Sequence, residues 1–221
     1  MMRGLTRGLI GAGVLAAVSA TAAAARPIEP PHAAPPPKTQ TVVFAGGCFW
    51  GIQSVFQHVK GVVSATSGYA GGWKDKPDYE EVSSGATGHA ESVRVVFDTS
   101  QVSFADLMRV FFTVAHDPTQ LNRQGPDVGT QYRSAIFYMN DEQKDMAQAY
   151  IGQLNASHLY AKPIVTQVAK LKNFYRAEDY HQNYAELHPD QPYIVINDAP
   201  KVVNLKKNFP TFFTDKLAAH E

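Results

Sequence analysis

A single cysteine, Cys48, stands where a predicted strand gives way to a predicted helix. The apolar run 41–45 and the glycines Gly46 and Gly47 precede it, and one helical face follows, formed by Phe49, Ile52, Val55, Phe56 and Val59. The first turn of a helix has unpaired N–H groups and a positive potential, which stabilise an anion such as a thiolate. Because helix N-termini lower cysteine pKa values from about 8.5 toward about 3.5–7.5, we expect a lowered pKa for Cys48 and predict a nucleophile.

The alternative for Cys48 is a small buried core residue, which is the usual role of a free cysteine. The glycines before it allow a sharp turn and a close approach of backbone to a bound molecule. Trp50 lies off the apolar helix face, so we expect it to line a pocket beside the sulfur. These neighbours favour the nucleophile.

Glu91 is the candidate acid. It stands at the start of a predicted strand, 92–97, on which Val93, Val95 and Phe97 alternate with their neighbours. A solvated carboxylate at a strand end would carry no chemistry. If Glu91 is buried, its pKa rises and it becomes a proton donor near neutral pH. The pattern alone leaves both possibilities open.

The beginning of the chain predicts export. Residues 1–25 contain Arg3 and Arg7, an apolar stretch at 9–20 and small residues at 23–25, the pattern of a secretory signal peptide. An uncleaved membrane anchor is the alternative. We therefore expect an exported, periplasmic protein.

The rest of the chain divides into a linker and one domain. Residues 26–40 contain six prolines and read as an extended linker, and residues 41–221 read as a single catalytic domain with a C-terminal tail. The 20 basic and 20 acidic residues balance, so nothing in the charge predicts nucleic-acid binding. A lone cysteine in an exported protein cannot close an internal disulfide and suggests redox chemistry served by an outside reductant.

The predicted order of elements is β-α-β-β-α-β-α-β, which indicates an α+β fold. We expect a two-layer sandwich with helices packed on a mixed sheet, a core like the split βαβ plan, and a long irregular C-terminal segment that wraps the domain. Tyr79 is placed in a loop at 73–86, a polar loop is expected at 119–130, and Tyr132 is placed in a strand at 132–139. His116 and Asp117 have no second histidine at metal-ligand spacing, so we expect a turn there and no metal site.

Six short motifs occur in an order typical of one family: Gly46-Gly47-Cys48-Phe49-Trp50-Gly51, Gly68-Tyr69-Ala70-Gly71-Gly72, Thr87-Gly88-His89-Ala90-Glu91, His116-Asp117-Pro118, Gly129-Thr130-Gln131-Tyr132-Arg133-Ser134 and Glu178-Asp179-Tyr180-His181-Gln182. With these motifs the chain resembles peptide methionine sulfoxide reductase A over residues 41–215. Any one of the motifs alone is a weak signal, whereas the combination is specific.

The resemblance implies a role for each matching residue. Cys48 matches the nucleophile and Glu91 the acid that protonates the sulfoxide oxygen. Tyr79 and Tyr132 match the hydroxyls that orient that oxygen, Asp127 matches a carboxylate near the site, and Phe49 and Trp50 match the aromatic wall around the substrate methyl group. The implied substrate is the S epimer of methionine sulfoxide, in oxidised proteins and free, acted on by a monomer.

Two positions depart from the family pattern. Gln53 stands where the family usually has glutamate, and the chain lacks the downstream resolving cysteines that many members carry. The resemblance therefore implies a Cys48 sulfenic acid that is reduced by an external thiol, either a thioredoxin-like protein or a reductant of the glutathione or glutaredoxin type. No bound cofactor is expected.

Two other classes of function compete with this interpretation. A cysteine hydrolase or thiol peroxidase would need a histidine base, for which His89 or His181 could serve. An exported binding module would capture methionine side chains in an aromatic pocket, with Cys48 merely buried.

Overall fold

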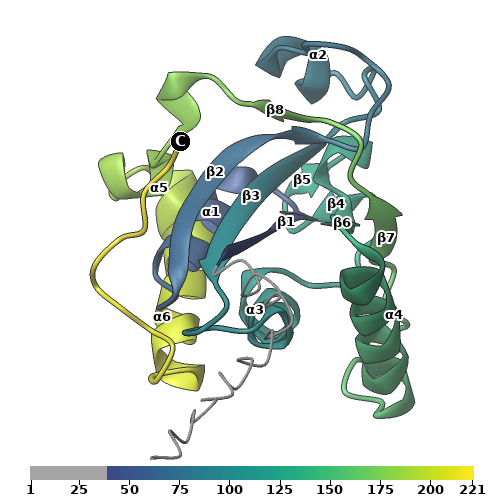
Figure 1. Cartoon of the computed structure of the whole chain (residues 1–221). Coiled ribbons are helices and arrows are strands. Elements are labelled where there is room, and N and C mark those ends of the chain that lie inside the picture. The colour runs from purple at the N-terminus through teal and green to yellow at the C-terminus, as the bar shows by residue number, and fades with distance from the viewer. Residues whose placement is uncertain (1–38) are drawn as a thin grey trace, which may run out of the picture. The chain divides into compact units, whose positions relative to one another are not determined.

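A six-stranded mixed sheet organises residues 39–221, which are the part of the chain that this computed structural model describes (Figure 1). Its order is β7-β6-β1-β3-β2-β8, from β1 (Thr39–Gly46), β2 (Val62–Ala70), β3 (Ala90–Asp98), β6 (Ser134–Tyr138), β7 (Gln167–Lys170) and β8 (Phe174–Arg176). Neighbouring strands are antiparallel, apart from the parallel pair β6 and β7. Strand β3 lies between β1 and β2, which α1 (Phe49–Gln57) connects, so the split βαβ core is confirmed.

The N-terminal predictions fall largely outside the described residues. The signal peptide at 1–25 and the linker up to residue 38 are among the residues that the structure does not describe. Thr39 and Gln40, however, pair with Asp98 and Phe97 in β1, so the last residues assigned to the linker belong to the sheet. Within residues 39–221, no helix is both long and apolar enough to cross a membrane.

One face of the sheet carries the main core because α1 and α3 (Phe104–Val110) pack on it (Figure 1). Phe44 of β1 stacks on Phe56 of α1, with ring centroids 4.9 Å apart, and on Phe111, 4.7 Å away. The opposite face carries mainly small residues, with Phe137 as the one large side chain of its buried cluster. The expected sandwich of helices on a sheet is therefore confirmed, and α1 is held firmly at its centre.

Local signals explain where several helices begin. Ser103 and Asp106 form a capping box at α3, and Asn140 caps α4 (Asp141–Ala156). The helix that begins after Ser103 is α-helical to Val110 and continues as a π-helical turn over Phe111–Ala115.

Other elements differ from the prediction. Tyr79 lies in the short helix α2 (Tyr79–Ser83), because Asp78 and Glu81 form a capping box. The predicted loop at 119–130 contains a small hairpin of β4 (Arg123–Gln124) and β5 (Asp127–Val128), and Tyr132 lies in a 3-10 turn before β6. After residue 177 the chain forms a 3-10 turn over Asp179–His181, followed by α5 (Tyr184–Leu187).

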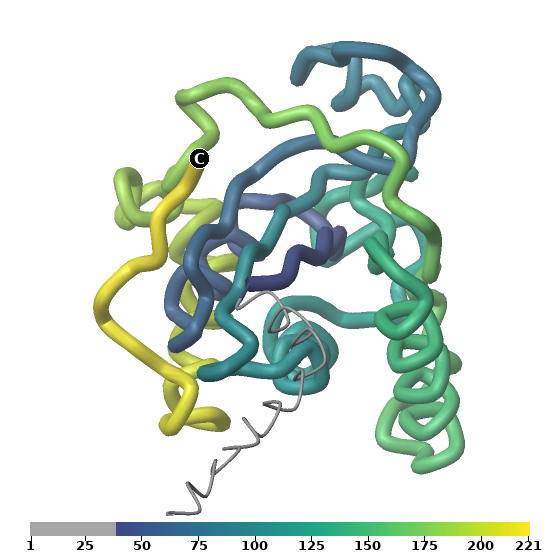
Figure 2. The backbone as a smooth tube through the Cα atoms, viewed as in Figure 1, coloured from purple at the N-terminus to yellow at the C-terminus, as the bar shows by residue number. Residues whose placement is uncertain are grey.

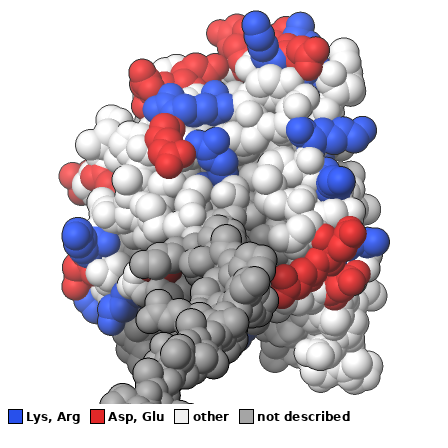
Figure 3. Space-filling view, viewed as in Figure 1, with Lys and Arg blue, Asp and Glu red and all other residues white. Residues whose placement is uncertain are grey.

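The C-terminal segment is more regular than expected. It contains a π-helical turn over Ile194–Asp198 that leads into α6 (Ala199–Asn208), and the chain then returns alongside β2, where Ser64 pairs with Ala219 (Figure 2). Charged side chains of both signs are interspersed on the face shown in Figure 3.

A network of buried amides joins this C-terminal half to α1. Gln53 donates from Nε2 to the Ala65 carbonyl and to Gln182 Oε1, each at 3.0 Å, and its Oε1 accepts the Asn183 N–H at 2.9 Å. Gln182 pairs with both backbone groups of Ser67 at 3.0 Å. The amide at position 53 thus uses both its donor and its acceptor atom, as glutamine can and a carboxylate cannot.

We predict that Gln182→Ala lowers the free energy of unfolding by about 3 kcal/mol, because it leaves the buried Ser67 N–H without its partner and removes bonds to the Ser67 and Ala177 carbonyls. Urea unfolding measures the change. Gln148→Ala, on the exposed side of α4, is the matched control and should change stability little. Equal stability of the two variants would contradict the role assigned to the network.

Candidate active site

Cys48 lies at the junction of β1 and α1, as the N-cap residue of the helix. Gly47 before it has φ +96°, a conformation that favours glycine, and a Cβ there would lie 2.6 Å from the Gln124 side chain. The turn therefore brings the sulfur to the helix N-terminus as predicted. The cysteine is only 8% exposed.

A pocket of about 200 Å³ opens at the sulfur. All seven site residues predicted from the sequence line it together with one that was not predicted, Tyr193, and the full set is Cys48, Phe49, Trp50, Tyr79, Glu91, Asp127, Tyr132 and Tyr193. They come from α1, α2, β3, β5, the turn before β6 and the C-terminal segment, so the fold gathers them from most of the domain.

Glu91 is buried, with 2% of its surface exposed. Its Oε2 accepts the Phe49 N–H at 3.0 Å, one of the unpaired donors of the first turn of α1. Burial raises its pKa from the ordinary 4.5 to about 8, although the hydrogen bond from the Phe49 N–H favours the carboxylate. Of the two possibilities left open for Glu91, the buried proton donor is the one that the structure supports.

The expectation of a lowered pKa for Cys48 is wrong. Burial raises the pKa of the thiol well above its ordinary value, and the carboxyl groups of Glu91 and Asp198 raise it further. A backbone hydrogen bond from Trp50 and the charge of Lys201 act in the opposite direction without reversing the shift. The helix terminus is present, but desolvation of the sulfur outweighs it.

Tyr79 and Tyr132 are two of the three phenols that line this pocket. Burial raises the pKa of Tyr79 and of Tyr132, so both hydroxyls stay protonated and can donate hydrogen bonds. Glu178 positions the helix that carries Tyr79, because its Oε1 accepts the Tyr79 N–H at 3.0 Å while its Oε2 accepts the Tyr69 hydroxyl at 2.7 Å.

Trp50 forms an aromatic wall of the pocket, as its place off the apolar face predicted. Its ring stacks on Tyr184 at 3.8 Å between centroids and meets Tyr193 edge-on at 6.0 Å. Its Nε1–H donates to His181 Nδ1 at 3.1 Å, which fixes the orientation of the indole. Tyr193 follows a proline in a segment without a motif of its own, so no local signal marked it as a pocket residue.

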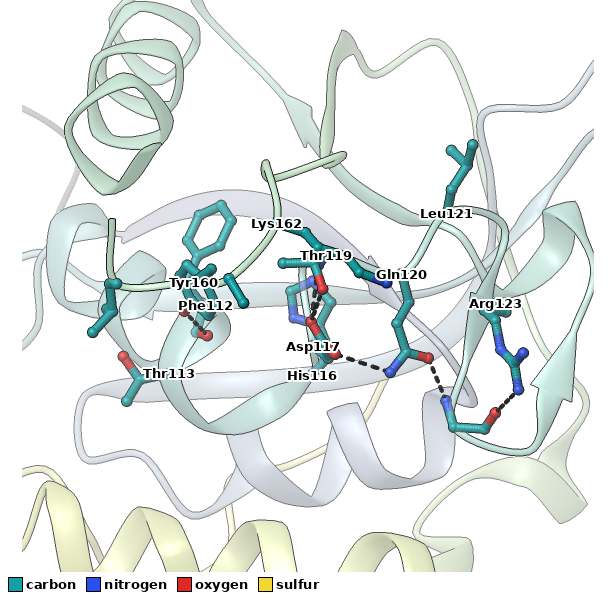
Figure 4. A pocket seen from close by; sticks show the side chains of 13 residues that line it. Phe112, Thr113, His116, Asp117, Thr119, Gln120, Leu121, Arg123, Tyr160 and Lys162 are labelled. Atoms are coloured by element: carbon teal, nitrogen blue, oxygen red, sulfur yellow. Dashed lines mark hydrogen bonds between the residues drawn. The ribbon is translucent and has the colours of Figure 1, made fainter. Parts of the chain in front are cut away.

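The β4–β5 hairpin carries Asp127 to the pocket, where Asp127 accepts a hydrogen bond from the Tyr193 hydroxyl. A larger cavity of about 920 Å³ lies against the hairpin, with Arg123 and Gly125 in its lining (Figure 4). There Gln120 Nε2 donates to Asp117 at 2.9 Å, and Gln120 Oε1 accepts the Gly125 N–H at 2.9 Å. Asp117 therefore belongs to a structural turn, as expected.

Neither candidate histidine base is among the residues that line the pocket at Cys48. His89 donates from Nε2 to the Lys74 carbonyl at 2.8 Å and accepts the Gly72 N–H at Nδ1, so both ring nitrogens are used away from the sulfur. His181 uses Nδ1 to hold Trp50. Across residues 39–221, no cluster of three or more His, Cys, Asp or Glu side chains could hold a metal ion.

The pocket combines a nucleophilic sulfur, a protonated carboxylic acid, two phenol donors and an aromatic wall. Donors that converge on one point stabilise an oxygen that gains negative charge or a proton. A small group with an apolar end and a polar oxygen on an electrophilic atom fits this arrangement. The fold and site define a thiol-dependent reductase.

The comparisons with known proteins agree. The family model for peptide methionine sulfoxide reductase matches residues 40–212, and the chain belongs to this family. Peptide methionine sulfoxide reductase MsrA 2 of Mesorhizobium japonicum is 58% identical over 180 residues, which cover 81% of this chain and 92% of that protein.

Solved structures show the same fold. Reduced Mxr1 from Saccharomyces cerevisiae matches with a TM-score of 0.63 and 34% identity, covering 71% of this chain and 90% of that one. Methionine sulfoxide reductase A of Corynebacterium diphtheriae matches with a TM-score of 0.61 and 39% identity, covering 69% and 76%. The resemblance that the motifs indicated is confirmed.

We predict that Glu91→Gln slows methionine formation by about 10²–10⁴-fold, the usual contribution of general acid catalysis. The amide can still accept the Phe49 N–H, so the pocket should keep its shape. In the unmodified protein the rate should fall as the pH rises through about 8, because Glu91 then loses its proton. This fall should be absent from Glu91→Gln.

Single-turnover rates measured between pH 6 and pH 9.5 test this. Glu142→Gln, an exposed glutamate of α4, is the matched control and should behave like the unmodified protein. An unchanged rate in Glu91→Gln would rule out Glu91 as the proton donor.

Proposed function

We propose that this protein reduces the S epimer of methionine sulfoxide, in oxidised proteins and as the free amino acid, and that Cys48 carries the reaction. The observation that carries the proposal is the convergence of Cys48, the buried Glu91 and the hydroxyls of Tyr79 and Tyr132 on one small pocket. Phe49 and Trp50 offer an apolar wall for the substrate methyl group.

The first half-reaction transfers oxygen from substrate to enzyme. Cys48 sulfur attacks the sulfoxide sulfur while Glu91 gives its proton to the sulfoxide oxygen, which the two phenols orient. The attack forms a bond between the two sulfurs. The protonated oxygen then moves to the Cys48 sulfur while the substrate's sulfur–oxygen bond and the sulfur–sulfur bond break, so methionine leaves and Cys48 holds a sulfenic acid. The substrate sulfur gains two electrons and the cysteine sulfur loses two.

The second half-reaction needs a thiol from outside the chain, because the sequence contains one cysteine. A first external thiol condenses with the sulfenic acid, releasing water and forming a mixed disulfide. A second thiol attacks that disulfide and frees Cys48. A thioredoxin-like protein, or a reductant of the glutathione or glutaredoxin type, would supply both thiols.

We predict that protein prepared fully reduced and then freed of thiols converts one equivalent of the S epimer per enzyme and stops. The peptide that contains Cys48 should then be about 16 Da heavier, which is the mass of one oxygen atom. Dithiothreitol should restart turnover. Chromatography of the methionine formed, with mass spectrometry of the protein, measures both.

Cys48→Ser and the R epimer of the same peptide are the controls, and neither should give methionine. Methionine formation by Cys48→Ser would favour the alternatives in which Cys48 is merely buried. Ester hydrolysis by the unmodified protein in place of sulfoxide reduction would favour a cysteine hydrolase.

We also propose that residues 1–25 direct export to the periplasm, where a methionine repair enzyme meets oxidised proteins. Support comes from the sequence pattern of this segment alone. We predict that cells producing the full chain accumulate a product lacking these residues in the exported fraction. Deleting residues 2–25 should retain the protein inside, as fractionation with N-terminal sequencing would measure.

A further inference from the structure

A buried ion pair lies against the first turn of α1, beside the catalytic cysteine. Asp198, just before α6, is 1% exposed, and its Oδ1 accepts a hydrogen bond from Lys201 Nζ at 3.0 Å. Gly51 leaves room for it, because a Cβ at Gly51 would lie 2.1 Å from Asp198 Oδ1 and 2.8 Å from Lys201 Nζ. Gly51 and Cys48 are three residues apart, and residues at this spacing share a helix face. The Asp198–Lys201 pair therefore lies on the same face of α1 as Cys48.

The pair is poorly suited to a purely structural role. Asp198 Oδ2 is buried and has no hydrogen-bond partner among the described residues. Charges buried with incomplete hydrogen bonding contribute little net stability and are often replaced by apolar residues without loss. Stability alone therefore does not explain why Asp198 and Lys201 are charged residues at these positions.

The titratable groups around Cys48 come from four elements. Glu91 of β3, which stays protonated near neutral pH, Asp127 of β5 and Asp198 supply carboxyl groups, and Lys201 of α6 supplies a positive charge. The phenols of the pocket are neutral, and His116, behind Gly46, is neutral as well because burial lowers its pKa to about 4. The positive charge of Lys201 therefore acts on Cys48 in the opposite direction to the surrounding carboxyl groups.

We propose that the Asp198–Lys201 pair tunes the reactivity of Cys48 through two opposed charges held against the first turn of α1, Asp198 favouring the thiol and Lys201 favouring the thiolate. The two residues are positioning residues, since neither is among those that line the pocket. Asp198 also fixes the ammonium group in place. The proposal rests on Cys48 as the nucleophile of the proposed function.

The test follows alkylation of Cys48 by iodoacetamide in the full chain, because this reaction consumes the thiolate and needs no sulfoxide. A nearby charge shifts a pKa by about one unit or more, so Lys201→Met should alkylate about 10-fold more slowly at pH 7. Asp198→Asn should alkylate about 10-fold faster for the same reason. The double variant should lie between the two.

The controls separate charge from structure. Lys207→Met changes an exposed lysine of the same helix and should leave the rate unchanged, and Lys201→Arg should retain most of the rate. If Asp198→Asn does not fold, the alkylation rate of Lys201→Met alone tests the proposal. An unchanged rate in Lys201→Met, or single variants that shift the rate in the same direction, would overturn the proposal.

Sulfoxide reduction by the unmodified protein is a separate measurement, so failure of the proposed function would be recognised independently. If the variants change the alkylation rate as expected but the protein does not reduce sulfoxide, the role of the ion pair would stand and the proposed function would be wrong. Sulfoxide reduction with charge-independent alkylation would retain the reductase and reject the role of the ion pair.

Discussion

The hydrogen bond from the Phe49 N–H to the Glu91 carboxyl is the interaction on which the site depends. It joins the first turn of α1 to β3, so the nucleophile and the acid are fixed to each other by two rigid elements. The bond also gives a buried carboxyl group a partner without giving it a counter-charge. Glu91 therefore stays in the pocket, where its burial outweighs the effect of this bond and keeps it protonated near neutral pH.

A second constraint is that α1 is enclosed on all sides. The sheet covers one side of it, and the C-terminal half covers the other through Gln182, Asn183 and α6. This enclosure removes water from the sulfur and the acid together. It also explains why polar residues of α1 such as Gln53 are buried and must find partners far away in the sequence.

Local patterns predicted what depends on neighbours in the sequence. The strand, two glycines and helix around Cys48 were correct, as was the buried face of α1, since each follows from spacing and turn chemistry. The capping box of Asp78 and Glu81 was also readable, so the loop assigned to Tyr79 missed a signal that was present.

What the sequence could not predict depends on residues brought together from a distance. Tyr193 reaches the pocket only because the C-terminal segment returns over α1. The raised pKa of Cys48 depends on burial and on Glu91 and Asp198, whose positions no local pattern reports. A helix terminus is a local feature whereas desolvation is a property of the whole fold, and at this site desolvation dominates.

A neutral thiol is at first sight a poor choice for a nucleophile, yet the proton balance of the proposed reaction accommodates it. The sulfoxide oxygen needs one proton as it leaves the substrate, and the thiol must lose one as it forms the new bond. Glu91 gives the first proton and, because it lines the same pocket as the Cys48 thiol, can accept the second. The acid is then protonated again at the end of the step, so a pocket that holds both groups neutral at rest needs no outside base.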